Sequence, residues 1–194
     1  MKDLLIHQLI KEVQNSPQLM EVHRFRNTEA FFVGRLNQID EKNKAYLFAT
    51  IEVDGTIDGF EWIPRNTIDY VSIQSRYVQD LFHQNQKISQ NEAYQTILKN
   101  LNFQELKFDD LSIATLTSTL AQKKRLVDLF FDTNEEMTGF IEEVDKVSLK
   151  LKNVIKNGLT DGVSFLPLDK ISALRFETKE LLFKELVYQV TYKS

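Results

Sequence analysis

The sequence predicts a mainly β protein with flanking helices (α+β), built from two tandem five-stranded small barrels. The first observation is an internal repeat: Gly34 matches Gly139 at an offset of 139 − 34 = 105, and Pro64 matches Pro167 at 167 − 64 = 103. The second is that each half contains five short β-rich segments separated by turn residues. Five short strands in an open sheet leave edge strands without partners, and closure into a barrel removes those edges.

The repeat extends over the whole second part of each predicted barrel. Four further matches share the offset of 103: Gly55, Asp58, Gly59 and Ile68 with Gly158, Asp161, Gly162 and Ile171. The Asp-Gly sequences supply residues that tolerate the positive φ of a tight hairpin. The predicted strands of the first half are 19–25, 30–39, 45–53, 60–63 and 68–73, with a polar turn at 26–29. Those of the second half are 125–131, 136–144, 147–155, 163–166 and 171–176.

Helical periodicity flanks both sets of strands. Residues 3–13 have one apolar face and end before Pro17, which predicts a helix that caps a barrel or docks on a partner. Residues 109–120 occupy the matching place in the second half. Ser75 and Thr178 follow the last strand of each set and predict the N-caps of two further helices.

The residues between the two halves predict a helical connector. The polar stretch 83–87 predicts a link, and 89–92 has a capping-box pattern that opens a helix running to Leu101. The tail at 186–192 fits either a helix end or an added strand. The predicted units are a first barrel with its helices at 1–83, the connector at 84–108, and a second barrel with its helices at 109–194.

The composition is that of a soluble globular protein. The chain has 194 residues, of which 42% are hydrophobic and 27% charged, and no apolar run approaches the roughly 20 residues that span a bilayer. We therefore expect no membrane association. The absence of cysteine excludes disulfides and thiol chemistry and favours a cytoplasmic protein. A net charge of −4 argues against a general polyanion binder.

One pattern of apolar residues around a glycine occurs in both halves. It comprises Phe32, Gly34, Leu36 and Ile39-Asp40 in the first half, and Met137, Gly139, Ile141 and Val144-Asp145 in the second. This pattern resembles the first motif of Sm-like proteins, including the bacterial host-factor type, and 62–71 and 165–174 are similar in placement to the second motif. The resemblance implies two Sm-like barrels that pack on each other. The resemblance also implies RNA binding as an alternative function. The Lys-His pair of the host-factor second motif, however, has no counterpart at 64–66 or 167–169.

No pattern of catalytic or metal-binding residues is present in the sequence. The three histidines have no partner at metal-ligand spacing and are expected at the surface or at caps. Asp40, Asp58 and their counterparts Asp145 and Asp161 fit ordinary turn chemistry. We therefore expect no enzyme activity, no metal and no cofactor.

The third strand differs between the two halves. In the second half, one face carries Ser148, Lys150 and Lys152, with Lys146 and Lys156 nearby, and these four lysines are the candidate ligand-binding residues. The same face in the first half carries Ala45, Leu47 and Ala49, which are candidate interface residues at the contact between the barrels or with a second chain. One interpretation is a lysine-rich face that prevents aggregation. In the other interpretation the two halves have different roles: the first half packs against another surface, and the second half binds an acidic partner or RNA.

These observations predict a non-enzymatic binding or regulatory module. The leading hypothesis is a protein–protein adaptor with an unknown protein partner. The alternative is an RNA-binding Sm-like protein that uses the basic strand of the second half, and a homo-oligomer is compatible with both. Trp62 and Phe165 stand at the same place in the repeat and are both expected to be buried.

Overall fold

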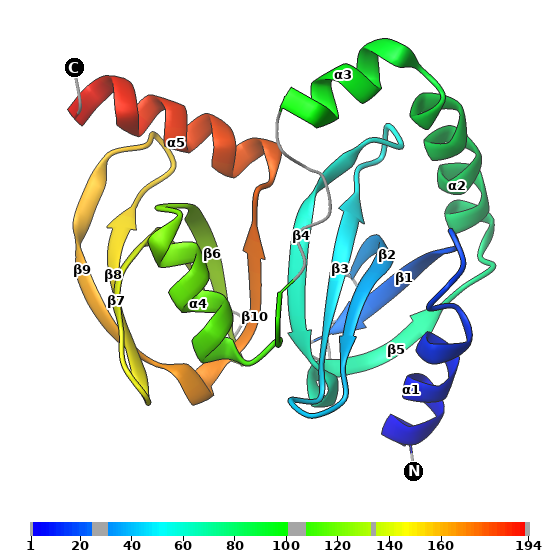
Figure 1. Ribbon diagram of the computed structural model, residues 1–194, viewed down its shortest axis with the longest axis horizontal. Helices are drawn as coiled ribbons and strands as arrows, with labels where there is room; N and C mark the ends of the chain where they lie inside the picture. Colours follow the sequence, from blue (N-terminus) through cyan, green and yellow to red (C-terminus); the bar gives the residue numbers. More distant parts are fainter. Residues whose placement is uncertain (1, 25–30, 101–107, 133–134, 193–194) are drawn as a thin grey trace.

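The computed structural model describes residues 2–24, 31–100, 108–132 and 135–192. These residues form one ten-stranded antiparallel sheet with five α-helices around it (Figure 1). The strands of the first half are β1 Leu19–Arg24, β2 Phe31–Asp40, β3 Ala45–Ile51, β4 Ile57–Pro64 and β5 Ile68–Ser72. Those of the second half are β6 Leu126–Phe131, β7 Glu136–Val144, β8 Ser148–Val154, β9 Thr160–Pro167 and β10 Ile171–Phe176. The helices are α1 Lys2–Glu12, α2 Arg76–Ser89, α3 Glu92–Asn100, α4 Ile113–Gln122 and α5 Lys179–Tyr192.

The prediction of two closed barrels is wrong. The strand order β5-β1-β2-β3-β4-β10-β6-β7-β8-β9 is that of one open sheet, which begins at β5 and ends at β9. The halves join where β4 pairs with β10, with Trp62 opposite Leu174 and Phe60 opposite Phe176. Each five-stranded half has two edges, and pairing one edge of each half removes two of the four without closing either half.

The two halves arrange their strands in the same way. Taken in chain order, the fifth strand of each half lies beside the first, and the second, third and fourth follow in turn. Gly34 and Gly139 stand at close crossings of strands: a Cβ atom there would lie 2.9 Å from the carbonyl oxygen of Ala49 and 2.5 Å from that of Lys152. A larger residue would push adjacent strands apart, which explains why both positions hold glycine.

The first core lies inside the curved sheet of the first half. Tyr46 and Phe48 of β3 point into it, and Ile10 and Val13, from α1 and the turn after it, cover its open end. The second core includes the inner residues of the second half, and α4 covers it as α1 covers the first. Leu4 and Leu5 of α1 remain exposed.

The helices differ from the prediction at their ends. The prediction of a link at 83–87 is wrong, since these residues belong to α2, which Ser75 caps and which Val78 and Leu81 anchor to the sheet. Asn91 caps α3, accepting a hydrogen bond from the Tyr94 amide at 3.2 Å. The tail at 186–192 is helical and belongs to α5. The expected turn at 26–29 and the connector residues 101–107 lie outside the described residues.

Among the helices of the described residues, none is long and apolar enough to cross a membrane.

Candidate functional site

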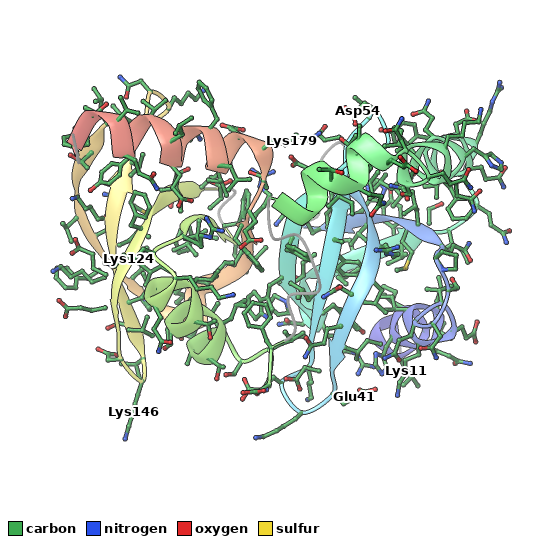
Figure 2. The ribbon with its side chains drawn as sticks, turned by 45° about the horizontal axis from the view of Figure 1, so that its top comes forward. Lys11, Glu41, Asp54, Lys124, Lys146 and Lys179 are labelled. Carbon is green, nitrogen blue, oxygen red and sulfur yellow. The ribbon has the colours of Figure 1, made fainter. Side chains whose placement is uncertain are left out.

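The four candidate lysines of the second half do not form a continuous basic surface. Lys150 makes ion pairs with Glu142 at 3.0 Å and Glu143 at 3.3 Å, and the hydrogen bonds that it donates to these two carboxylates raise the pKa of Lys150. Lys146 and Lys156 are exposed, but they stand beyond opposite ends of the seven-residue strand β8 (Lys146 in Figure 2). The local surface around β8 is therefore mixed in charge.

Lys152 is held by an aromatic side chain of the final helix. Its Nζ donates to the Tyr188 hydroxyl at 2.9 Å, and this hydrogen bond raises the pKa of Lys152. The same ammonium group lies 5.3 Å from the centre of the Tyr188 ring. Two of the four predicted ligand-binding lysines thus have partners within the chain.

The apolar face of β3 is covered by the chain itself. Leu47, Ala45 and Ala49 are buried in the core that is shared with the second half. Phe108 and Leu111, which precede α4, belong to the same core. These three residues therefore lie inside the core shared by the two halves and are not at the surface of the chain.

Hydrogen bonds fix the covering segment on the first half. Gln38 and Phe108 are joined twice, since the Gln38 amide donates to the Phe108 carbonyl at 2.8 Å and accepts from the Phe108 N–H at 3.2 Å. The Trp62 indole N–H donates to the Leu111 carbonyl at 2.8 Å. The Leu111 N–H in turn donates to the Asp40 carboxylate at 2.6 Å.

A buried network of charges crosses the junction between the halves. Arg24 pairs with Glu61 at 2.7 Å and Arg175 pairs with Asp128 at 3.0 Å, while both guanidinium groups lie over the Phe130 ring at 4.3 and 5.2 Å. Burial raises the pKa of Glu61, and the positive charges of Arg24 and Arg175 oppose that shift. Each ion pair lies within one half, but Glu61 and Arg175 are opposite each other on β4 and β10, so we assign the network to holding the halves together.

A polar pocket of about 330 Å³ lies where the β3–β4 hairpin meets the start of α5. Asp58 accepts a hydrogen bond from the Lys179 N–H at 3.1 Å, and the Lys179 ammonium lies 3.8 Å from Asp54 (Figure 2). Burial raises the pKa of Asp58 to about 6, with a contribution from neighbouring Glu52. The groups bind each other across the junction, which gives this pocket a structural role.

The raised pKa of Asp58 predicts a dependence of stability on pH. Its folded pKa of about 6 exceeds the ordinary value of 3.8, so the stabilisation is fully present below about pH 4 and is lost as the pH rises through about 6. Asp58→Asn stays neutral and should be more stable than the wild type at about pH 8, with the advantage shrinking towards about pH 4. Urea unfolding at both pH values measures this, with exposed Asp169→Asn as the control. An equal effect of Asp58→Asn at both pH values would refute it.

The sequence led us to expect the three histidines at the surface or at caps, but two of them are buried. His7 is buried and lies 2.7 Å from the Tyr46 hydroxyl, and burial lowers its pKa. His23 is buried and stacks on Tyr70 with ring centres 3.8 Å apart. His83 is exposed. Within the described ranges, no group of three or more histidine or acidic residues is placed to hold a metal ion.

The outer strand β9 exposes two large apolar side chains. Phe165 is 73% exposed and Val163 is 49% exposed, although both belong to a regular strand. Trp62 and Phe60 stand at the matching places on β4 and are 4% and 3% exposed. The prediction of burial is thus confirmed for Trp62 and wrong for Phe165. Trp62 and Phe60 belong to the core shared by the two halves, which also includes Leu111, whereas β9 is the last strand of the sheet and Phe165 belongs to no core cluster of the described residues.

The neighbours of these two side chains define the candidate binding surface. Phe165 lies opposite Lys150 and Val163 lies opposite Lys152 on β8. We call Val163, Phe165, Lys150 and Lys152, with the outer backbone of β9, the β9 edge surface. Its apolar side chains stand beside the open edge of the sheet, which suits contact with another polypeptide.

A second exposed apolar surface lies on α5. Phe183, Leu186 and Val190 are 66%, 56% and 66% exposed, and they recur at helical spacing along one face. The buried side of α5 carries Leu181, Lys184 and Glu185, and Val187, between this side and the stripe, lies against Gly158 of the β8–β9 hairpin. Nothing in the described residues covers the stripe, and no feature beside it identifies an occupant.

No protein-family model matches this chain, and no curated protein matches it in sequence.

Proposed function

We propose that the protein is a non-enzymatic binding module that acts as a protein–protein adaptor through the β9 edge surface. The observation that carries the proposal is the exposure of Phe165, at 73%, on a strand whose counterpart β4 buries Trp62 at 4%. The proposal treats the two halves as copies of one structural unit. In the first copy the fourth strand has its partner, and in the second copy the same strand is available.

Addition of a strand is the binding mode that fits this surface. An edge strand presents alternating backbone N–H and C=O groups, which pair with an extended segment of another protein and supply affinity. Apolar side chains on the same edge select the partner by its side chains. Val163 and Phe165 fill that role, and Lys150 and Lys152 beside them favour a partner segment that carries some acidic residues.

Protein is a better-supported partner than nucleic acid. The net charge is −4, and the lysines on β8 are partly neutralised by Glu142 and Glu143 or held by Tyr188. Affinity for a polyanion depends on many lysine and arginine contacts with phosphates, each of which releases counterions. The β9 edge surface offers few such contacts and two large apolar side chains.

A capture experiment with a matched control tests the proposal. Immobilised wild-type protein should retain a set of proteins from a cell extract that immobilised Phe165→Lys does not retain. Val147→Lys is the control, because Val147 is 71% exposed and lies in the turn before β8, outside the β9 edge surface. Quantitative mass spectrometry of the three bound fractions measures the difference. Identical fractions for wild type and Phe165→Lys would refute the proposal.

RNA binding should be weak and should not depend on the β8 lysines. For single strands, each phosphate contact contributes a slope of about −0.7 to the dependence of log affinity on log salt. Lys150→Ala with Lys152→Ala should leave that slope unchanged within about half a unit. Fluorescence anisotropy with uridine-rich and adenine-rich oligonucleotides measures it. Sub-micromolar binding at physiological salt, lost in the double variant, would instead establish the RNA-binding alternative.

A further inference from the structure

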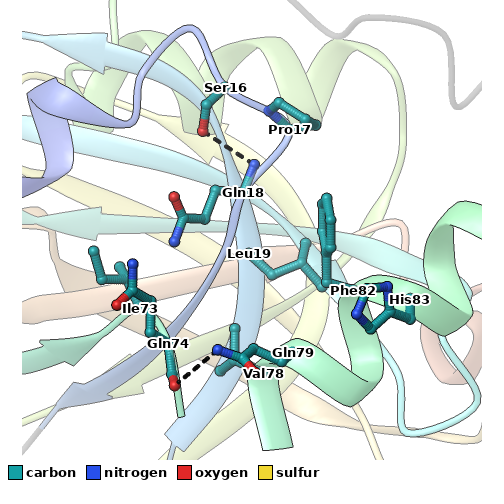
Figure 3. Close-up of a pocket in the computed structure, with 10 residues that line it drawn as sticks. All are labelled: Ser16, Pro17, Gln18, Leu19, Ile73, Gln74, Val78, Gln79, Phe82 and His83. Carbon is teal, nitrogen blue, oxygen red and sulfur yellow. Dashed lines mark hydrogen bonds between the residues drawn. The ribbon is translucent and has the colours of Figure 1, made fainter. Parts of the chain in front are cut away.

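An open pocket of about 340 Å³ lies at the opposite end of the sheet from β9. The turn before β1, the residues that follow β5 and the first turns of α2 form its walls (Figure 3). Pockets that bind small molecules have volumes of roughly 300–1,000 Å³. The pocket shares no residue with the β9 edge surface, so its occupant is independent of the proposed function.

The floor of the pocket is apolar. Leu19 and Val78 are buried there in one small core cluster, and Phe82 packs against that cluster from the next turn of α2. Ile73 and Phe82 stand on either side of Leu19 in Figure 3. An apolar occupant would therefore meet aliphatic groups on one side and an aromatic ring on the other.

Neutral polar groups form the rest of the lining. The Ser16 hydroxyl accepts a hydrogen bond from the Gln18 backbone N–H at 3.1 Å. The Gln79 side-chain amide donates to the Gln74 carbonyl at 3.3 Å. The side-chain amide of Gln18 makes no hydrogen bond with the other residues drawn in Figure 3, so it offers a donor and an acceptor to an occupant.

The internal repeat identifies the corresponding place in the second half. Leu19 and Leu126 have the same register position on β1 and β6, because their partners on β2 and β7 are 140 − 35 = 105 residues apart, which is the offset of the two glycines. Gln18 and Arg125 directly precede these leucines. Arg125 is therefore the counterpart of Gln18.

The second half places charged groups where the first half has the pocket. The Arg125 guanidinium group lies 3.5 Å from Glu177 and 3.5 Å from Glu185, and both glutamates are buried. Their counterparts at the offset of 103 are Gln74 and Phe82. The first half thus has an amide in place of the guanidinium group, and an amide and a phenyl ring in place of the carboxylates. Its pocket is open where the second half has an ion network.

We infer that the pocket binds a neutral small molecule with a mainly apolar body and one group that hydrogen-bonds to Gln18. The apolar body lies between Ile73 and Phe82 and covers Leu19. The lining contains no aspartate, glutamate, lysine or arginine. A charged ligand would lose its hydration in the pocket without gaining such a partner, which is unfavourable.

Three indole compounds that differ in charge test this inference. At neutral pH indole-3-acetamide is neutral, indole-3-acetate is an anion and tryptamine is a cation. Indole-3-acetamide should shift the backbone amide NMR signals of Leu19, Gln74 and Gln79 in the full chain, with a dissociation constant of about 1 mM or below. The two charged compounds should bind about fivefold more weakly or less, because the pocket does not compensate their charge.

A double variant introduces charged groups of the second half into the pocket. Gln18→Arg with Gln74→Glu should weaken the binding of indole-3-acetamide by about tenfold or more. Neither residue belongs to a core cluster, and NMR signals that are unchanged in the rest of the sheet will verify the fold. Gln86→Arg with Gln90→Glu makes the same exchanges on exposed side chains outside the pocket and should leave the affinity unchanged. The charge series on the wild type needs no substitution.

Several outcomes would overturn the inference. These are the absence of a shift with indole-3-acetamide, equal binding of the three compounds, shifts only outside the pocket, and undiminished binding to the double variant. A pocket that binds none of the compounds, in a chain whose double variant loses proteins captured from a cell extract, has a protein segment as its occupant, and this also overturns the inference. Loss of captured proteins in Phe165→Lys concerns the β9 edge surface alone, so the two proposals fail separately.

Discussion

Replacing Trp62 by alanine is expected to reduce the free energy of unfolding by about 3–5 kcal/mol, the usual cost of deleting a large buried aromatic side chain. Trp62 is 4% exposed and lies in the core shared by both halves, with Leu174 opposite it on β10. The substitution also removes the hydrogen bond from the indole N–H to the Leu111 carbonyl. Urea unfolding followed by circular dichroism measures the loss.

Phe165→Ala provides the matched control for this substitution. Phe165 stands at the same place in the second half and is 73% exposed, so its removal should change stability by less than about 0.5 kcal/mol. A cost for Phe165→Ala as large as that for Trp62→Ala would mean that β9 is covered within the single chain. A cost below about 1 kcal/mol for Trp62→Ala would contradict its position in the shared core.

Replacing Arg175 by methionine is the second substitution with a large expected effect. Its guanidinium group pairs with Asp128, whose side chain is 3% exposed, and its charge also favours the carboxylate of buried Glu61. Methionine keeps much of the side-chain volume but leaves Asp128 without its cation. Breaking a buried ion pair by removing one partner costs about 3–5 kcal/mol, because the remaining charge stays desolvated.

An exposed arginine serves as the control for charge removal. Arg76 is 95% exposed and lies 4.0 Å from Asp80, so Arg76→Met should change stability by less than about 0.5 kcal/mol. Chemical unfolding of both variants at neutral pH gives the comparison. Equal and small effects would show that the Arg175–Asp128 pair is as well solvated as a surface pair, and would remove the charge network from the forces that join the halves.

The strands were largely predictable from local patterns. Residues 136–144 and 171–176 form strands with the expected bounds, and Ser75 and Thr178 cap the helices that follow β5 and β10. These features depend on alternation of side chains and on capping hydrogen bonds within a few residues, so the sequence contains them directly.

The pairing of β4 with β10 was not predictable in the same way. Phe60 and Phe176 are opposite each other but are separated by 176 − 60 = 116 residues in the chain. An edge strand gains a hydrogen-bonded partner whether each half closes into a barrel or the two halves join. The composition of the strands does not decide between these two arrangements. The arrangement also determines the exposure of single residues, since Trp62 is buried in the core that the joined halves share and Phe165 is exposed on the outer strand.

The candidate site was visible in the sequence only as a difference between the halves. The spacing of Lys150 and Lys152 predicted that they share one face of β8. In the structure Phe165 and Val163 of β9 lie opposite these two lysines. Spacing did not reveal that Glu142 and Tyr188 contact those lysines, because the contacts come from β7 and α5. In the first half the matching face of β3 carries Leu47, and its apolar character indicated that another segment covers it. The covering residues Phe108 and Leu111 are about 60 residues further along the chain, so local patterns did not identify them.

Amide hydrogen exchange tests most directly the claim that β9 is an available edge at which the protein binds. In dilute protein, the amides of β4 and β10 should exchange slowly, whereas outward-facing amides of β9 and β5 should exchange quickly. With a captured partner protein bound, exchange of the β9 amides should slow, and exchange of the β3 amides should not change. Exchange in β9 that is already slow in the protein alone, or that stays fast with a captured partner protein bound, would contradict the claim.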